Sequence, residues 1–114
     1  MTPSRIDAAT WVEHFAGLQA QGLAWFDFLT AIDRGDHVDV IACVADHARS
    51  QSELVTTEVF SELDSLSGLF AGASWYERET QEMFGIRFIG LADQRPLIRR
   101  SFIDPPPLRR TSAS

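Results

Sequence analysis

The chain has 114 residues, of which 45% are hydrophobic, so it can form one domain around a core of its own. Its formal net charge of −6 argues against nucleic acid as a partner, because phosphates are held chiefly by neutralising cations. The single cysteine, Cys43, excludes an internal disulfide and a self-contained iron–sulfur cluster with its roughly four ligands, and no apolar run approaches the about 20 residues that span a bilayer.

The first half of the chain predicts one helix and a β-hairpin. Asp7 is a suitable helix N-cap, and Gly22 ends the run of apolar residues at helical spacing that follows it. Residues 25–30 and 38–44 have the composition and alternation of strands. The short connection between them, with Gly35 available for a positive φ, predicts an antiparallel pair.

A third strand is predicted around residues 53–57. Residues 60–70 then carry Leu63, Leu66 and Phe70 on one side and predict a short helix. This order predicts an α+β fold, in which a small antiparallel sheet of about three strands is covered by helices. The histidines lie on different predicted elements without paired-ligand spacing, so we predict no metal site.

Residues 75–86 mix charged side chains with large apolar ones. On a helix, Trp75, Glu79 and Met83 share one stripe, and Gly85 is a suitable left-handed C-cap. Buried charges are tolerated only when they are paired and hydrogen-bonded. The segment therefore predicts an interface or a fixed polar network, against the alternative of a solvated charged helix face.

Arg78 lies between Glu77 and Glu79 and one helical turn from Glu82. We interpret it as the cation that neutralises these carboxylates. The alternative is that the three glutamates form a catalytic acid–base group, with pKa values raised by common burial, in a free-standing small enzyme.

The same segment carries a family resemblance. The matching residues are Glu77-Arg78-Glu79, Glu82, Met83-Phe84 and Gly85-Ile86-Arg87-Phe88, followed by Arg95 and Pro107-Leu108-Arg109-Arg110. They resemble the signature of the 30 kDa subunit family (the C subunits) of respiratory complex I, the NADH:quinone oxidoreductase. Residues 29–33 and 69–75 are similar to further family segments. Leu91 replaces the family's histidine, and longer members continue beyond the point where this chain ends.

The resemblance implies a similar α+β fold and a non-catalytic scaffold subunit in the peripheral arm of that complex. It implies no cofactor in this chain, with iron–sulfur clusters in partner subunits. The implied partners are the large subunit at the quinone or [NiFe] site, the small iron–sulfur subunit and, indirectly, the membrane arm. The implied location is the cytoplasmic side of the cell membrane. The alternative is the equivalent subunit of a membrane-bound energy-converting [NiFe]-hydrogenase or formate hydrogenlyase complex.

Charge divides the chain into two parts. Residues 1–84 hold four arginines and fourteen acidic residues, whereas residues 85–114 hold six arginines and two acidic residues. We predict an α+β domain over residues 1–90 and an extended, basic, proline-containing arm over residues 91–114. The predicted interface residues are Trp75, Glu77, Arg78, Glu79, Glu82, Met83, Phe84, Gly85, Arg95, Arg99, Arg100, Pro107, Leu108, Arg109 and Arg110.

Overall fold

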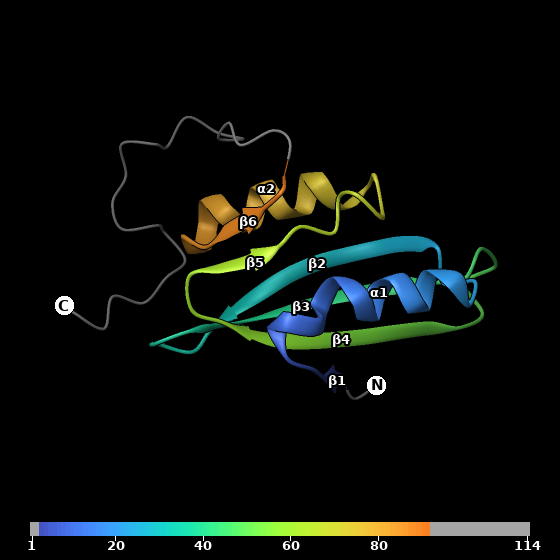
Figure 1. The fold of residues 1–114 in the computed structure, drawn as a ribbon, viewed down its shortest axis with the longest axis horizontal. Coiled ribbons are helices and arrows are strands. Elements are labelled where there is room, and N and C mark those ends of the chain that lie inside the picture. Colours follow the sequence, from blue (N-terminus) through green and yellow to red (C-terminus); the bar gives the residue numbers. More distant parts are fainter. Residues whose placement is uncertain (1–2, 92–114) are drawn as a thin grey trace.

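The computed structural model describes residues 3–91, which form an α+β fold, as predicted (Figure 1). The elements in chain order are β1 (Ser4–Arg5), the 3₁₀ turn η1 (Ala8–Thr10), α1 (Trp11–Ala20), β2 (Trp25–Asp33), β3 (Val38–Ala45), β4 (Ser52–Val59), β5 (Glu62–Asp64), α2 (Ala73–Phe84) and β6 (Arg87–Ile89). Within these residues, no helix is long and apolar enough to cross a membrane.

The main sheet has the strand order β1-β4-β3-β2. The predicted antiparallel strands β2, β3 and β4 are confirmed, and Gly35 turns the first hairpin with a φ of 97°. The parallel edge strand β1 was not predicted, because two residues carry no measurable alternation. A register shift between Phe26 and Phe28 marks a bulge in β2.

Both helices contribute to one core against the main sheet (Figure 1). Trp11 and Phe15 of α1 are fully buried and meet edge to face, with ring centroids 4.8 Å apart. Phe26 of β2 contacts both Phe70 and Tyr76, at centroid distances of 5.5 and 5.9 Å. Full burial of a large apolar side chain stabilises a fold by about 1.5–3 kcal/mol, so Trp11 and Phe15 hold α1 on the sheet, and half-buried Phe26 and Tyr76 join α2 to it.

The predicted helix over residues 60–70 is wrong. Glu62–Asp64 forms β5, which pairs in parallel with β6 as a second, two-stranded sheet, and turns follow it. Leu63, Leu66 and Phe70 are buried, so their spacing identified core positions correctly. Residues 62–64 form a strand instead of a helix because they pair with β6, which is distant in the sequence. Local periodicity gives no information about such a long-range pairing.

The region around α2 agrees with the prediction. The helix runs from Ala73 to Phe84, and Gly85 ends it with a left-handed φ of 76°. The extended exit becomes β6, in which Phe88 is fully buried. Leu91 is also buried, in the same core. The rest of the predicted arm, including Arg95, Arg99, Arg100, Pro107, Leu108, Arg109 and Arg110, lies outside the described residues.

Candidate functional site

Helix α2 directs Glu77 into the protein and Glu79 toward the solvent. Glu77 is fully buried, on the same face as Ala73 and Thr80. Trp75 is 56% exposed and Glu79 is exposed. Helical spacing gives the stripes of a helix but not the direction in which each one faces, so the sequence did not single out Glu77.

The Glu77 carboxylate binds the turn that follows β5. Its Oε1 accepts a hydrogen bond from Ser65 Oγ at 2.5 Å, and its Oε2 accepts one from the Leu66 N–H at 2.6 Å. Ser65 Oγ lies 2.7 Å from Ser67 Oγ. Because the single Ser65 proton is used on Glu77, the Ser67 hydroxyl is the donor to Ser65. These bonds form a buried clamp between α2 and the turn, which we call the Glu77 clamp.

Burial raises the pKa of Glu77 from 4.5 to about 7, against the opposing effect of the hydrogen bonds from Ser65 and Leu66. Desolvation dominates because the carboxylate lies inside the protein with neutral donors only. Near neutral pH the clamp therefore exists in both a charged and a protonated form. Both donors favour the charged form, since a carboxylate accepts at each oxygen.

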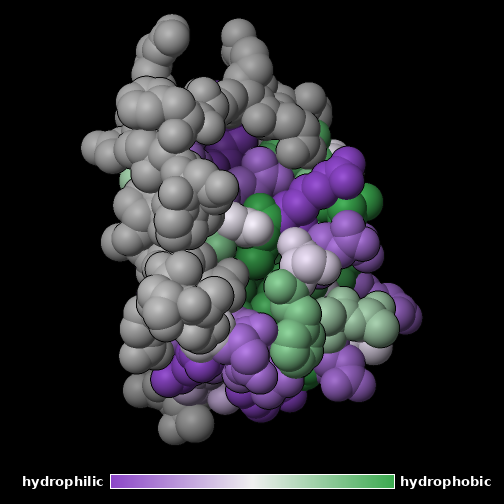
Figure 2. Space-filling view, turned by 90° about the vertical axis from the view of Figure 1, so that its left-hand side faces the viewer, coloured by the Kyte–Doolittle hydropathy of each residue, from purple (hydrophilic) through white to green (hydrophobic). Residues whose placement is uncertain are grey.

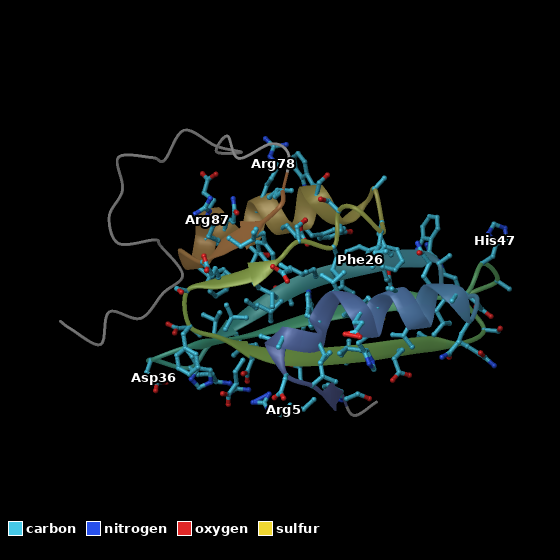
Figure 3. All side chains as sticks on the ribbon, viewed as in Figure 1. Arg5, Phe26, Asp36, His47, Arg78 and Arg87 are labelled. Atoms are coloured by element: carbon cyan, nitrogen blue, oxygen red, sulfur yellow. The ribbon has the colours of Figure 1, made fainter. Side chains whose placement is uncertain are left out.

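Helix α2 places Arg78 on a different side from Glu77, and the role of Arg78 as an organising cation stays a prediction. Neighbouring helix positions point about 100° apart. Figure 3 shows Arg78 on the side of α2 away from the sheet, whereas Glu77 points into the protein. The hydrogen bonds to Glu77 come from Ser65 and Leu66.

The proposed catalytic group of three glutamates is not assembled. Glu77 is enclosed in the clamp, Glu79 is exposed, and Glu82 is half-buried on α2. Two cavities within residues 3–91 are lined by residues of β1, η1, β4, β5, β6 and their connections, and neither of these two touches α2. Because Glu77 points inward and Glu79 outward, these carboxylates do not share one substrate pocket.

A second polar cluster lies at the β2–β3 hairpin, near the Arg5 and Asp36 labels of Figure 3. Asp39 is buried and binds Arg34 Nε at 2.8 Å and Arg5 at 3.3 Å. His37 Nε2 lies 3.6 Å from Asp39 and 3.9 Å from Glu58. The sequence contains no direct signal for this cluster, because Asp39 and Glu58 meet only through the register of β3 and β4.

His37, Asp39 and Glu58 place ligand atoms within 4.8 Å of one another, which is a possible cation site. A cation already occupies this position, because the guanidinium of Arg5 lies 3.3 Å from Asp39 and 3.5 Å from Glu58. A divalent ion would have to displace that guanidinium, and it would also be repelled by the positive charge of Arg34, which pairs with Asp39. The cluster is thus accounted for as an ion-pair network that ties β1 to the hairpin.

Together, the fold and the clamp define a small α+β domain whose charged motif helix is fixed from inside and exposes an aromatic outer face. The chain belongs to the family described as respiratory-chain NADH dehydrogenase, 30 Kd subunit, whose pattern matches residues 4–113. This match confirms the resemblance that the motif carries.

Relatives agree over most of the chain. It is 33% identical over 92 residues to the mitochondrial NADH-ubiquinone oxidoreductase 30.4 kDa subunit of Neurospora crassa, which covers 81% of this chain and 32% of that protein. It is 38% identical over 92 residues to the C/D subunit of NADH-quinone oxidoreductase of Klebsiella pneumoniae, covering 81% of this chain and 13% of that one. The chain thus spans a third or less of these relatives.

Two solved structures share the fold. The trypsin-resistant fragment (1-134) of Nqo5 superposes with a TM-score of 0.64 at 19% identity, over 78% of this chain and 79% of that one. A chain of the membrane-bound sulfane sulfur reductase, an archaeal respiratory membrane complex, superposes with a TM-score of 0.73 at 15% identity, over 90% and 64%. At these identities the likeness establishes the fold alone.

Proposed function

We propose that this chain is the non-catalytic 30 kDa-type (C) subunit in the peripheral arm of a complex I-like NADH:quinone oxidoreductase. In this role it scaffolds the large quinone-site subunit and the small iron–sulfur subunit. It carries no cofactor of its own and works at the cytoplasmic side of the membrane, with the iron–sulfur clusters in its partners. Family membership supports the class of complex, and the outer face of α2 supports the scaffolding role.

The observation that carries the proposal is the contrast between the two faces of α2. Trp75 is 56% exposed and lies on one stripe with exposed Glu79 and half-buried Met83. A large exposed aromatic on a rigid helix is the kind of residue that anchors protein interfaces. Since the Glu77 clamp fixes the helix from the inside, this outer face can be presented in a constant position.

The basic arm provides the second contact in this proposal. Arg95, Arg99, Arg100, Arg109 and Arg110 would pair with carboxylates or carbonyls of the large partner, and Leu108 would add an apolar anchor. The motif residues Arg78, Glu82, Phe84 and Gly85 and the arm residue Pro107 belong to the same interface. Rim charges of this kind mainly speed association, whereas buried anchors slow dissociation.

A second candidate is the same role in a membrane-bound [NiFe]-hydrogenase or formate hydrogenlyase complex. An archaeal respiratory membrane complex whose name mentions sulfane sulfur rather than NADH also contains a chain of this fold. The absence of the family histidine at Leu91 points the same way.

The deciding experiment is purification of the native complex through a tag on this chain, with identification of its subunits. NADH-binding flavoprotein subunits support the first candidate, and a large subunit with nickel-binding Cys-x-x-Cys pairs supports the second. Recovery of the chain without partner subunits contradicts both. Trp75→Ala should reduce the recovery of partner subunits. Trp25 of β2 is 46% exposed and serves as the control, because Trp25→Ala should leave that recovery unchanged.

A further inference from the structure

Two hollows meet at Ala8, beside η1 and β5, and we call them together the end groove. They have volumes of about 760 and 230 Å³ and share Ala8 in their linings. The larger hollow lies beside β1 and the end of β4, and the smaller one beside β5 and β6. Figure 2 views the molecule from its left-hand side in Figure 1 and shows apolar residues lying between polar ones.

The end groove exposes two large apolar side chains. Phe60 is 64% exposed in the larger hollow, and Ile89 is 37% exposed in the smaller one. Single exposed apolar residues are common, but two in hollows that share a lining residue offer a surface that a ligand can cover. The groove therefore suits a segment with apolar side chains.

The rim of the end groove is acidic. Asp7 lines the larger hollow, and Glu62 and Asp64 line the smaller one. None of the three takes part in an ion pair within residues 3–91, whereas Arg5, the cation of the groove, is engaged by Asp39 and Glu58. The carboxylates of the rim therefore suit a basic segment, and arginine suits them best because its planar fork matches a carboxylate.

One segment with both properties belongs to the chain itself. Residues 95–102 read Arg-Pro-Leu-Ile-Arg-Arg-Ser-Phe, with three arginines and three large apolar side chains. The described chain ends at Leu91, two residues after Ile89 of the groove and just past Gly90, whose φ of 91° turns the backbone. Four residues reach about 14 Å when extended, enough to bring Arg95 to the adjacent rim.

We propose that, in the chain outside its complex, the end groove holds the arm segment 95–102. Arg95, Arg99 and Arg100 pair with the rim carboxylates, and the apolar side chains of the segment cover Phe60 and Ile89. Tethering favours this contact, since a short link between two binding elements gives an effective concentration in the millimolar range. The contact goes beyond the proposed function: in the complex, the partner must take the arm over from the groove.

The test places a nitroxide on the arm of the full-length chain. Because Cys43 is the only cysteine, the variant Cys43→Ala with Ser101→Cys carries one label. The amide NMR signals of Glu62, Asp64 and Ile89 should lose at least about half their intensity at low salt and recover at about 0.5 M salt, where charges are screened. Signal loss confined to Trp75 and Glu79 of α2, or spread evenly over the domain, overturns the proposal.

A charge-matched pair of variants separates the groove from general attraction. Glu62→Arg with Asp64→Arg should abolish the local signal loss at the unchanged amide of Ile89. Glu13→Arg with Glu79→Arg makes the same change in net charge on exposed positions of α1 and α2, and should preserve it. Equal effects of both pairs contradict the proposal. Co-purification with partner subunits tests the proposed function separately, because it does not depend on where the free arm lies.

Discussion

Glu77 of α2 accepts a hydrogen bond at 2.6 Å from the backbone N–H of Leu66, although both residues lie in the buried core. The bond joins the motif helix to the turn after β5, so one carboxylate sets the position of the helix relative to the small sheet. Removing a buried charge from water is costly, and the raised pKa of Glu77 records that cost.

The first prediction concerns the pH dependence of stability. The folded pKa of Glu77, about 7, lies above its ordinary value of 4.5. The stabilisation by this group is therefore fully present below pH 4.5 and is lost as pH rises through about 7. The loss is about 3 kcal/mol in the free energy of unfolding.

Glu77→Gln should remove this part of the pH dependence, because the amide does not titrate in this range. Denaturant unfolding of both proteins at several pH values measures the difference, with Glu79→Gln as an exposed control. If wild type and Glu77→Gln differ by the same amount at pH 4.5 and pH 8, Glu77 does not titrate as predicted.

The second prediction concerns the hydroxyl in the clamp. Ser65→Ala deletes the 2.5 Å donor to Glu77 and should lower the free energy of unfolding by about 1–3 kcal/mol, because a buried acceptor loses its partner. It should also raise the pKa of Glu77 further, since a hydrogen bond to the charged form is lost.

Ser67→Ala provides the comparison for that variant. It removes a donor to Ser65 but leaves both bonds to Glu77, so its effect on stability should be smaller. A Ser67→Ala variant less stable than Ser65→Ala would show that the serine pair, rather than its bond to Glu77, holds the turn.

Most of the helices and strands could be predicted from the sequence, but the buried hydrogen bonds of Glu77 could not. The alternation of residues 38–44 and the left-handed Gly85 are local signals, and both predicted the correct elements. The inward position of Glu77 depends on how α2 is rotated about its axis where it packs against residues 65–70. That rotation is set by contacts between segments distant in sequence, which local patterns do not show. Strand β5 was missed for the same reason, since its three residues are ordered by pairing with β6.

The third prediction tests the helix stop at Gly85. Its φ of 76° is left-handed, so Gly85→Ala should lower the free energy of unfolding by about 1–2 kcal/mol. Gly17 in the middle of α1 is the matched control, because nothing lies within 4 Å of an added Cβ there. Gly17→Ala should stabilise the domain by up to about 1 kcal/mol. Thermal unfolding measures both changes in stability. If the two variants change the stability in the same direction, the assignment of a left-handed cap at Gly85 is contradicted.

The last prediction concerns the distal arm. Truncation after Asp104 removes the three prolines and the run Leu108-Arg109-Arg110. A proline-rich basic segment of this kind gains little by folding on its own, so the melting temperature of the isolated chain should stay nearly unchanged. Incorporation into the complex should weaken, and the loss should be larger at low salt, where the two deleted arginines contribute most. Unfolding of the isolated chain after this truncation would instead place the distal arm in the domain's own core.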